Sequence, residues 1–121
     1  MGRLTTHVLN VAAGIPAAGM RIELRAAAAA SSAVVDLAPI ATAQTNADGR
    51  CPAPLLEGSA LRIGRYTLTF HVAEYFRALR HELPEPPFLD EVVIAFGIAD
   101  HKDYHVPLLV SPWSYSTYRG S

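Results

Sequence analysis

Apolar and polar residues alternate with a period of two along much of the chain, and this pattern constrains the fold most. In a β-strand successive side chains point to opposite faces of the sheet, so the alternation predicts strands that bury one face. The predicted strands are residues 20–26, 66–72, 88–98 and 104–110, with 4–11 and 113–118 as further candidates of mixed faces. Turn residues separate them at 13–16, 46–49 and 100–102. Short strands with frequent turns are typical of an all-β sandwich or barrel.

One segment departs from the strand pattern. Between Ala73 and His81, the side chains of Tyr75, Phe76 and Leu79 recur at helical spacing. Glu74 lies in the first turn, where a negative charge complements the helix dipole. We therefore predict one short helix in this segment.

Composition narrows the class of protein. The chain has 121 residues, 50% of them hydrophobic, and a formal net charge of −1. We expect a single domain over residues 1–121, and neither a disordered chain nor a protein that binds nucleic acid mainly through phosphates. The lone Cys51 excludes an intrachain disulfide and a cysteine-rich zinc site, and we expect it to be inert. No apolar run reaches the ~18 residues of a membrane span, and the N-terminal residues lack an apolar signal core, so we expect a cytoplasmic protein.

Taken singly, the chemically capable side chains have ordinary structural explanations. His7 lies mid-strand, where a lone histidine is usually a structural residue, and Arg50 closes a turn as a surface residue. His101, Asp103 and His105 share one face if the strand is extended, and two histidines with a carboxylate could hold zinc. The favoured interpretation is that His101 and Asp103 are solvated turn residues. His105 lies deeper in the strand and is harder to explain in this way.

The last residues of the chain form a polar and aromatic segment, Tyr115–Ser121. Chain ends normally fray, and a strand of this composition at the very end suggests a terminus that is held in place. We therefore expect this segment to contribute to a site or an interface.

Four segments together resemble the sequence signatures of the transthyretin-related 5-hydroxyisourate hydrolases. They are Leu4–Asn10 with Gly14–Ala17, Thr45–Cys51, His105–Pro112 and Tyr115–Ser121. The Tyr75-Phe76 pair falls where that family has its one short helix. The alanine-rich segment 26–40 departs from the family pattern, and we expect a long loop there.

The resemblance implies a fold, an assembly and a reaction. The fold would be a transthyretin-like sandwich of two four-stranded antiparallel sheets with one short helix. Two subunits would pair edge to edge, and two dimers would pack face to face into a homotetramer with sites at the dimer–dimer interface. The substrate would be the small molecule 5-hydroxyisourate, whose six-membered ring water opens at an amide carbonyl. The product would be 2-oxo-4-hydroxy-4-carboxy-5-ureidoimidazoline, in the second step of urate degradation, with no metal and no cofactor.

The resemblance also assigns site residues. The catalytic residues would be His7, Arg50, His105 and Ser121, and the substrate-binding residues Tyr118, Arg119 and Gly120. A neutral imidazole suits the removal of a proton from water near pH 7, and a guanidinium stabilises the charge that develops on the carbonyl oxygen. A second histidine could protonate the leaving nitrogen, and Ser121 could orient a histidine by its hydroxyl or its terminal carboxylate. The sequence does not decide which histidine is the base.

Three other functions compete with this one. A transthyretin-type carrier would use the same fold to bind a flat ligand, but it is expected to lack His7, His105 and the Tyr-Arg-Gly-Ser end. A metal-dependent hydrolase would use His101, Asp103 and His105. A structural sandwich fused to other domains would need a linker, and none is visible in the sequence.

Overall fold

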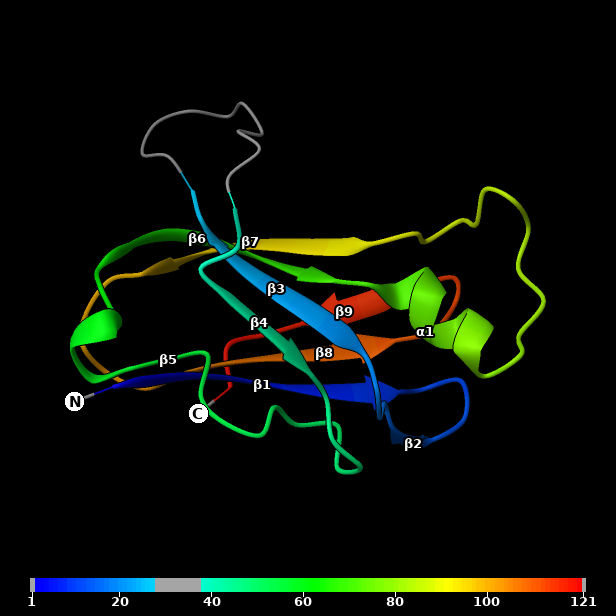
Figure 1. Ribbon diagram of the computed structural model, residues 1–121, viewed down its shortest axis with the longest axis horizontal. Coiled ribbons are helices and arrows are strands. Elements are labelled where there is room, and N and C mark those ends of the chain that lie inside the picture. Colours follow the sequence, from blue (N-terminus) through cyan, green and yellow to red (C-terminus); the bar gives the residue numbers. More distant parts are fainter. Residues whose placement is uncertain (1, 28–37, 121) are drawn as a thin grey trace.

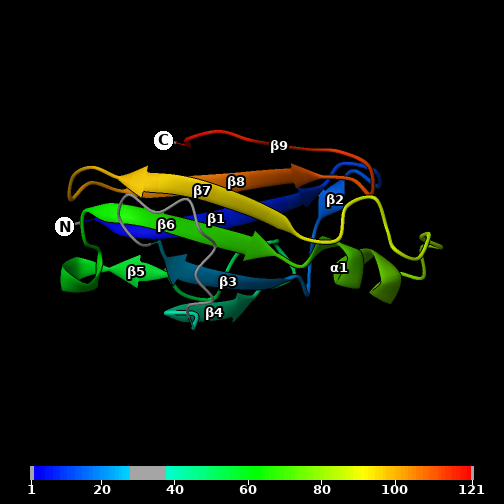
Figure 2. The ribbon, with the colours of Figure 1, turned by 90° about the horizontal axis from the view of Figure 1, so that it is seen from above.

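The computed structural model describes residues 2–27 and 38–120 of the chain. Two β-sheets face each other, with a helix at one end and the two termini toward the other (Figures 1 and 2). The strands of the first sheet are β1 (Arg3–Asn10), β2 (Ile15–Pro16), β5 (Leu56–Glu57), β8 (Tyr104–Val110) and β9 (Tyr115–Thr117). Those of the second sheet are β3 (Arg21–Ala26), β4 (Ala41–Gln44), β6 (Gly64–Phe70) and β7 (Val92–Ile98). A 3₁₀ turn covers Gly58–Ala60, and the helix α1 covers Val72–Ala78.

The two sheets differ in strand direction. The second has the order β4-β3-β6-β7 and is antiparallel throughout. The first has the order β2-β1-β8-β9, with β5 also on β1, and β1 and β8 run parallel. The expectation of two four-stranded antiparallel sheets was therefore wrong for the first sheet. Its two central strands come from opposite ends of the chain, so no hairpin turn forces them to be antiparallel.

The core lies between the sheets and is built from the inward positions of the alternating strands. Leu4 and Val8 of β1 and Leu108 of β8 are fully buried from one sheet, and Leu24 and Leu68 are fully buried from the other. Burial of each such side chain is worth roughly 1.5–3 kcal/mol relative to its exposure. The alternate residues of β1 and β8 face outward and do not contribute to this core, so they are available to form a functional site.

The helix closes one end of this core. Tyr75 and Phe76 of α1 are buried, and the side-chain amide of Asn10 donates a hydrogen bond of 3.2 Å to the Tyr75 hydroxyl. This contact joins the end of β1 to the helix without leaving a buried polar group unpaired.

The all-β class, the helix and the six expected strands are confirmed, with some boundaries shifted. Residues 88–98 form a strand only from Val92, and Phe88 is 77% exposed in the preceding loop. The short strands β2, β4 and β5 were missed, because two to four residues carry too little alternation.

Of the expected loop 26–40, residues 28–37 lie outside the described part of the chain. No helix in the described part is long and apolar enough to cross a bilayer, and the cytoplasmic location and the single domain stay predictions.

The turn before Arg50 is held against β1 by backbone contacts. The Asn46 side-chain oxygen accepts hydrogen bonds from the backbone N–H groups of Asp48 (2.9 Å) and Arg50 (3.2 Å). The Gly49 carbonyl accepts a hydrogen bond of 2.8 Å from the Val8 backbone N–H. Gly49 has a φ of +75°, and a Cβ there would lie 2.4 Å from the Val8 carbonyl oxygen. Only glycine allows the turn to approach the strand this closely.

This geometry predicts unequal costs for two glycine substitutions. Gly14 has a φ of +70° but open space around its Cβ position among the described atoms. Gly14→Ala should therefore cost about 1 kcal/mol of unfolding free energy from strain alone, whereas Gly49→Ala should cost about 3 kcal/mol or more because the backbone must also separate. Denaturant unfolding at matched protein concentration measures both. Equal losses would contradict the steric argument.

Candidate active site

His7 and His105 lie side by side on the outward face of the first sheet. In the parallel register of β1 and β8, Thr5 is the partner of His105, and His7 is the partner of Pro107. Thr5, His7 and His105 are each half-buried, whereas their neighbours along the strands point into the core. The pairing thus places two imidazoles on one surface, in residue pairs that are two positions apart along the two strands.

Arg50 reaches the same surface from the turn. His7 and Arg50 form an isolated antiparallel bridge, and His7 Nε2 donates a hydrogen bond of 3.0 Å to the Asp48 carbonyl oxygen. A carbonyl only accepts, so this bond requires the proton to be on Nε2 of His7. In the neutral ring, Nδ1 is then the nitrogen that can accept a proton. Arg50 directly follows the turn, as the sequence predicted, and its bridge with His7 places it at the edge of the sheet.

His105 is oriented by a residue that the sequence analysis did not assign to the site. Its Nδ1 lies 2.8 Å from the Thr5 hydroxyl oxygen. A hydroxyl can donate or accept, so this contact can orient the ring in either protonation state. The only signal in the sequence was that Thr5 shares the parity of His7 in the alternating strand.

The surroundings of His105 favour its neutral form. Burial lowers the pKa of His105 below its ordinary value of 6.5, and the positive charge of Arg50 and then that of His7 lower it further. Burial acts because a charged imidazolium loses hydration, and the two cationic neighbours act by repulsion. His105 therefore stays neutral, and able to accept a proton, at a pH where an isolated histidine is partly protonated.

The C-terminal segment passes directly over His105. The Thr117 hydroxyl donates to the Pro107 carbonyl oxygen (2.7 Å), and the Gly120 N–H donates to the His105 carbonyl oxygen (2.8 Å). A Cβ on Gly120 would lie 2.6 Å from Cδ2 of the His105 ring, so the tail backbone packs against the imidazole. Glycine at this position is what allows that contact.

Of the seven residues expected in the site, the structure brings four together. His7, Arg50, His105 and Gly120 come together. Tyr118 is 61% exposed, and the guanidinium carbon of Arg119 lies 4.4 Å from the centre of the Tyr104 ring. Ser121 lies outside the described residues.

Two of the three alternative zinc ligands, His101 and Asp103, do not join this cluster. His101 and Asp103 precede the start of β8, so the strand alternation does not extend to them. Asp103 accepts a hydrogen bond of 3.0 Å from the Arg3 backbone N–H. Within residues 2–27 and 38–120, no three side chains of His, Cys, Asp or Glu are grouped as metal ligands. Burial raises the pKa of the Cys51 thiol, which keeps it in its unreactive form.

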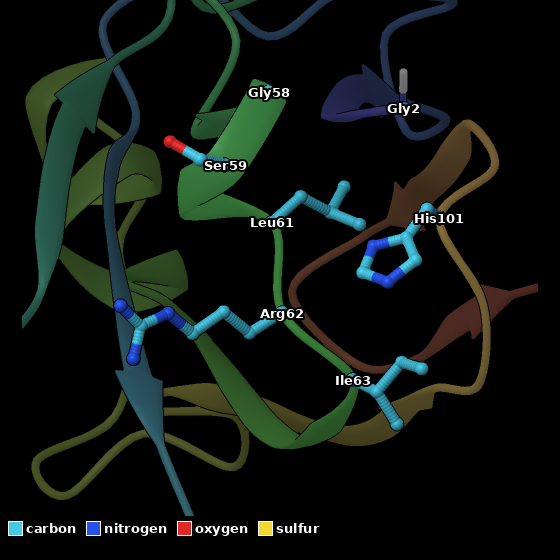
Figure 3. A pocket seen from close by; sticks show the side chains of 7 residues that line it. All are labelled: Gly2, Gly58, Ser59, Leu61, Arg62, Ile63 and His101. Atoms are coloured by element: carbon cyan, nitrogen blue, oxygen red, sulfur yellow. The ribbon is translucent and has the colours of Figure 1, made fainter.

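A separate pocket lies near the N-terminal end of β1 (Figure 3). Its volume is about 490 Å³, and its lining includes Leu61, Arg62 and His101 but none of the clustered site residues. The Arg62 side chain points away from His101 in this view. The pocket thus gathers no set of polar groups around one point.

Comparison with known proteins agrees with the geometry. Residues 4–120 match the sequence profile of the HIUase/Transthyretin family. The chain belongs to this family. It is 58% identical to the 5-hydroxyisourate hydrolase of Ralstonia nicotianae over the whole of both chains. It is 55% identical to that of Pseudomonas aeruginosa, over all of this chain and 93% of the relative.

Solved structures of the family superpose along the full chain. The 5-hydroxyisourate hydrolase of Klebsiella pneumoniae matches with a TM-score of 0.80 and 31% identity, covering 100% of both chains. Sea bream transthyretin in complex with thyroxine matches with a TM-score of 0.82 and 24% identity, covering 98% of this chain and 94% of that one. The latter likeness shows the shared fold alone.

The electrostatics predict a measurable titration. The pKa of His105, followed by NMR of its ring protons, should lie below 6.5. Arg50→Gln removes one of the two repelling charges, so the pKa should rise. Arg77→Gln is the matched control, because Arg77 pairs with Glu85 beside the helix, away from β8. An unchanged His105 pKa in Arg50→Gln would contradict the assigned cause.

Proposed function

We propose that this protein hydrolyses 5-hydroxyisourate to 2-oxo-4-hydroxy-4-carboxy-5-ureidoimidazoline, the second step of urate degradation. The observation that carries the proposal is the convergence of His7, Arg50 and His105 on one face of the sheet, under the backbone of Gly120. The full-length similarity to 5-hydroxyisourate hydrolases, at 50–58% identity in five bacterial relatives, supports the same activity. A carrier function has weaker support, because the likeness to the thyroxine complex extends to the fold alone.

In the proposed mechanism His105 is the general base. Its lowered pKa keeps it neutral near pH 7, so it can take a proton from water as the oxygen attacks the amide carbonyl. Arg50 faces the carbonyl oxygen and stabilises the negative charge that develops there. The ring C–N bond then breaks, and His7, acting in its imidazolium form, gives its Nδ1 proton to the leaving nitrogen while Nε2–H stays bonded to the Asp48 carbonyl oxygen. Transfer of a proton from His105 to His7 restores both residues, so that one water is consumed for each ring opened.

The tail would complete the site. Tyr118, Arg119 and Gly120 remain assigned to substrate binding in this proposal, and Ser121 to the orientation of a histidine. The crowded contact between Gly120 and the His105 ring supports a direct role for the tail. No metal or cofactor is assigned to the reaction.

We further propose that the active form is a homotetramer with sites where two dimers meet. Apolar side chains are exposed at one end of the first sheet, where Val11 (49%), Trp113 (68%) and Tyr115 (46%) would otherwise face water. Thr5, His7 and His105, on the outward face of β1 and β8 in the same sheet, are also only partly buried. A second copy covering this face would enclose the two histidines and exclude bulk water from the reaction.

The first test is a decay assay. Urate oxidised in situ supplies 5-hydroxyisourate, whose ultraviolet decay the protein should accelerate. His7→Asn and His105→Asn should each lower kcat/KM by about 100-fold or more, the usual contribution of a proton-transfer residue. His101→Asn is the matched control and should keep full activity, because His101 lies outside the cluster. EDTA should leave the rate unchanged, and a loss that zinc restores would contradict the metal-free mechanism.

The second test removes the tail. A chain ending at Thr117 should remain folded and assembled, because Tyr118 and Arg119 are exposed and Gly120 has no side chain, so that little is removed from the core. It should nevertheless lose activity. Circular dichroism checks the fold, light scattering the mass, and the decay assay the function. Full activity would exclude the last four residues from the site. Inactivity caused by dissociation would make the tail a structural element.

A further inference from the structure

The side chain of Arg119 does not lie on the face that carries the two histidines. Its guanidinium carbon is 4.4 Å from the centre of the Tyr104 ring, a distance that gives a cation–π contact. Tyr104 begins β8 and is buried against the core, while His105, the next residue, faces outward. Because neighbours in a strand point to opposite faces, Arg119 contacts the sheet on the side away from the His105 ring.

The ring beneath Arg119 is fixed at its far end. The Tyr104 hydroxyl accepts a hydrogen bond of 2.9 Å from the Ala99 N–H and donates one of 3.1 Å to the Asp100 carboxylate. The Lys102 backbone N–H donates to the same carboxylate at 3.2 Å. That bond, then the Tyr104 hydroxyl and the charges of Lys102 and Arg119, hold the pKa of Asp100 below its ordinary value. Tyr104 is therefore a rigid platform beside a carboxylate that stays ionised.

Two consecutive residues of the tail thus contact two consecutive residues of β8. Arg119 lies over Tyr104, and Gly120 hydrogen-bonds the backbone of His105 and packs against its ring. The strand β9 ends at Thr117, and among the described residues the isolated bridge between Gly120 and His105 continues the pairing of the tail with β8. The contact of the Arg119 side chain with the Tyr104 ring restrains the tail at the residue next to Gly120.

We propose that Arg119 is a positioning residue that anchors the C-terminal segment on Tyr104 and so holds Gly120 against His105. This inference deepens the proposed hydrolase function and rests on it for its catalytic consequence. In this inference Arg119 does not contact the substrate, in contrast to the substrate-binding role given to it above. It acts on catalysis by holding Gly120 in place. Tyr104 and Asp100 become part of the support of the site, although neither faces the histidines.

The anchoring is tested without substrate. Amide hydrogen exchange at Gly120, read by NMR of protein labelled with ¹⁵N-glycine, should be faster by about 5-fold in Arg119→Gln, as expected for loss of one exposed cation–π contact. Tyr104→Leu should give a similar increase, since it keeps apolar volume but removes the aromatic face. Tyr104→Phe keeps the aromatic ring and loses only the hydrogen bonds of the hydroxyl, so it should have a smaller effect. It also keeps the test informative if the leucine variant fails to fold. Arg77→Gln is the control and should leave the exchange unchanged.

The catalytic consequence is tested in the decay assay. Arg119→Gln should lower kcat by about 5-fold with KM little changed, because a looser tail weakens positioning and not a substrate contact. The double variant with Tyr104→Leu should lose no more than the worse single variant, because both break one contact. Arg119→Lys keeps a cation over the ring and should recover part of the rate.

The outcomes separate the two proposals. Unchanged exchange at Gly120 in Arg119→Gln overturns the anchor, whatever the activity. Faster exchange with unchanged kcat overturns the positioning role. A raised KM in Arg119→Gln that is additive with Tyr104→Leu makes Arg119 a substrate ligand. An inactive wild-type protein would refute the hydrolase function, while the exchange data would still decide whether the anchor exists.

Discussion

The parallel pairing of β1 with β8 is the interaction on which the rest of the site depends. It joins the first and last long strands of the chain, and its register sets Thr5 opposite His105 and His7 opposite Pro107. A shift by one residue would turn one histidine into the core, because side chains alternate between faces. The buried leucine and valine positions of the two strands prevent such a shift, so the packing of the core fixes the geometry of the surface cluster.

The other edge of β1 is shared by three short segments. β2 pairs near its C-terminal end and β5 near its N-terminal end, and Gly49 and Arg50 occupy the gap between them. Each backbone group on this edge needs a partner, and the turn supplies the missing ones. Arg50 is thereby placed beside His7 by backbone hydrogen bonding, which leaves its guanidinium available for chemistry.

Two histidines of this chain show how environment sets their use. His71 lies between β6 and α1, where its ring nitrogens contact the carboxylates of Glu23 and Glu91, and its hydrogen bond lowers the pKa of Glu23. His105 is half-buried near Arg50 and His7, and its own pKa is lowered. The first arrangement is a network of polar contacts with two carboxylates, and the second is a partly buried, electropositive environment that favours a neutral imidazole.

The sequence by itself determined the all-β class, the long strands, the helix and the candidates His7, Arg50 and His105. These follow from local rules, since side-chain period and turn residues act over a few neighbours, and from motifs that resemble a known family. Only the tertiary structure decided the parallel direction of β1 and β8, the short strands on the edge of β1, the contact of Thr5 with His105 and the position of Arg119 over Tyr104. Each of these joins residues far apart in the chain or depends on which sheet edge is free. Such contacts are chosen by packing and by the pairing of backbone groups, which no local pattern records.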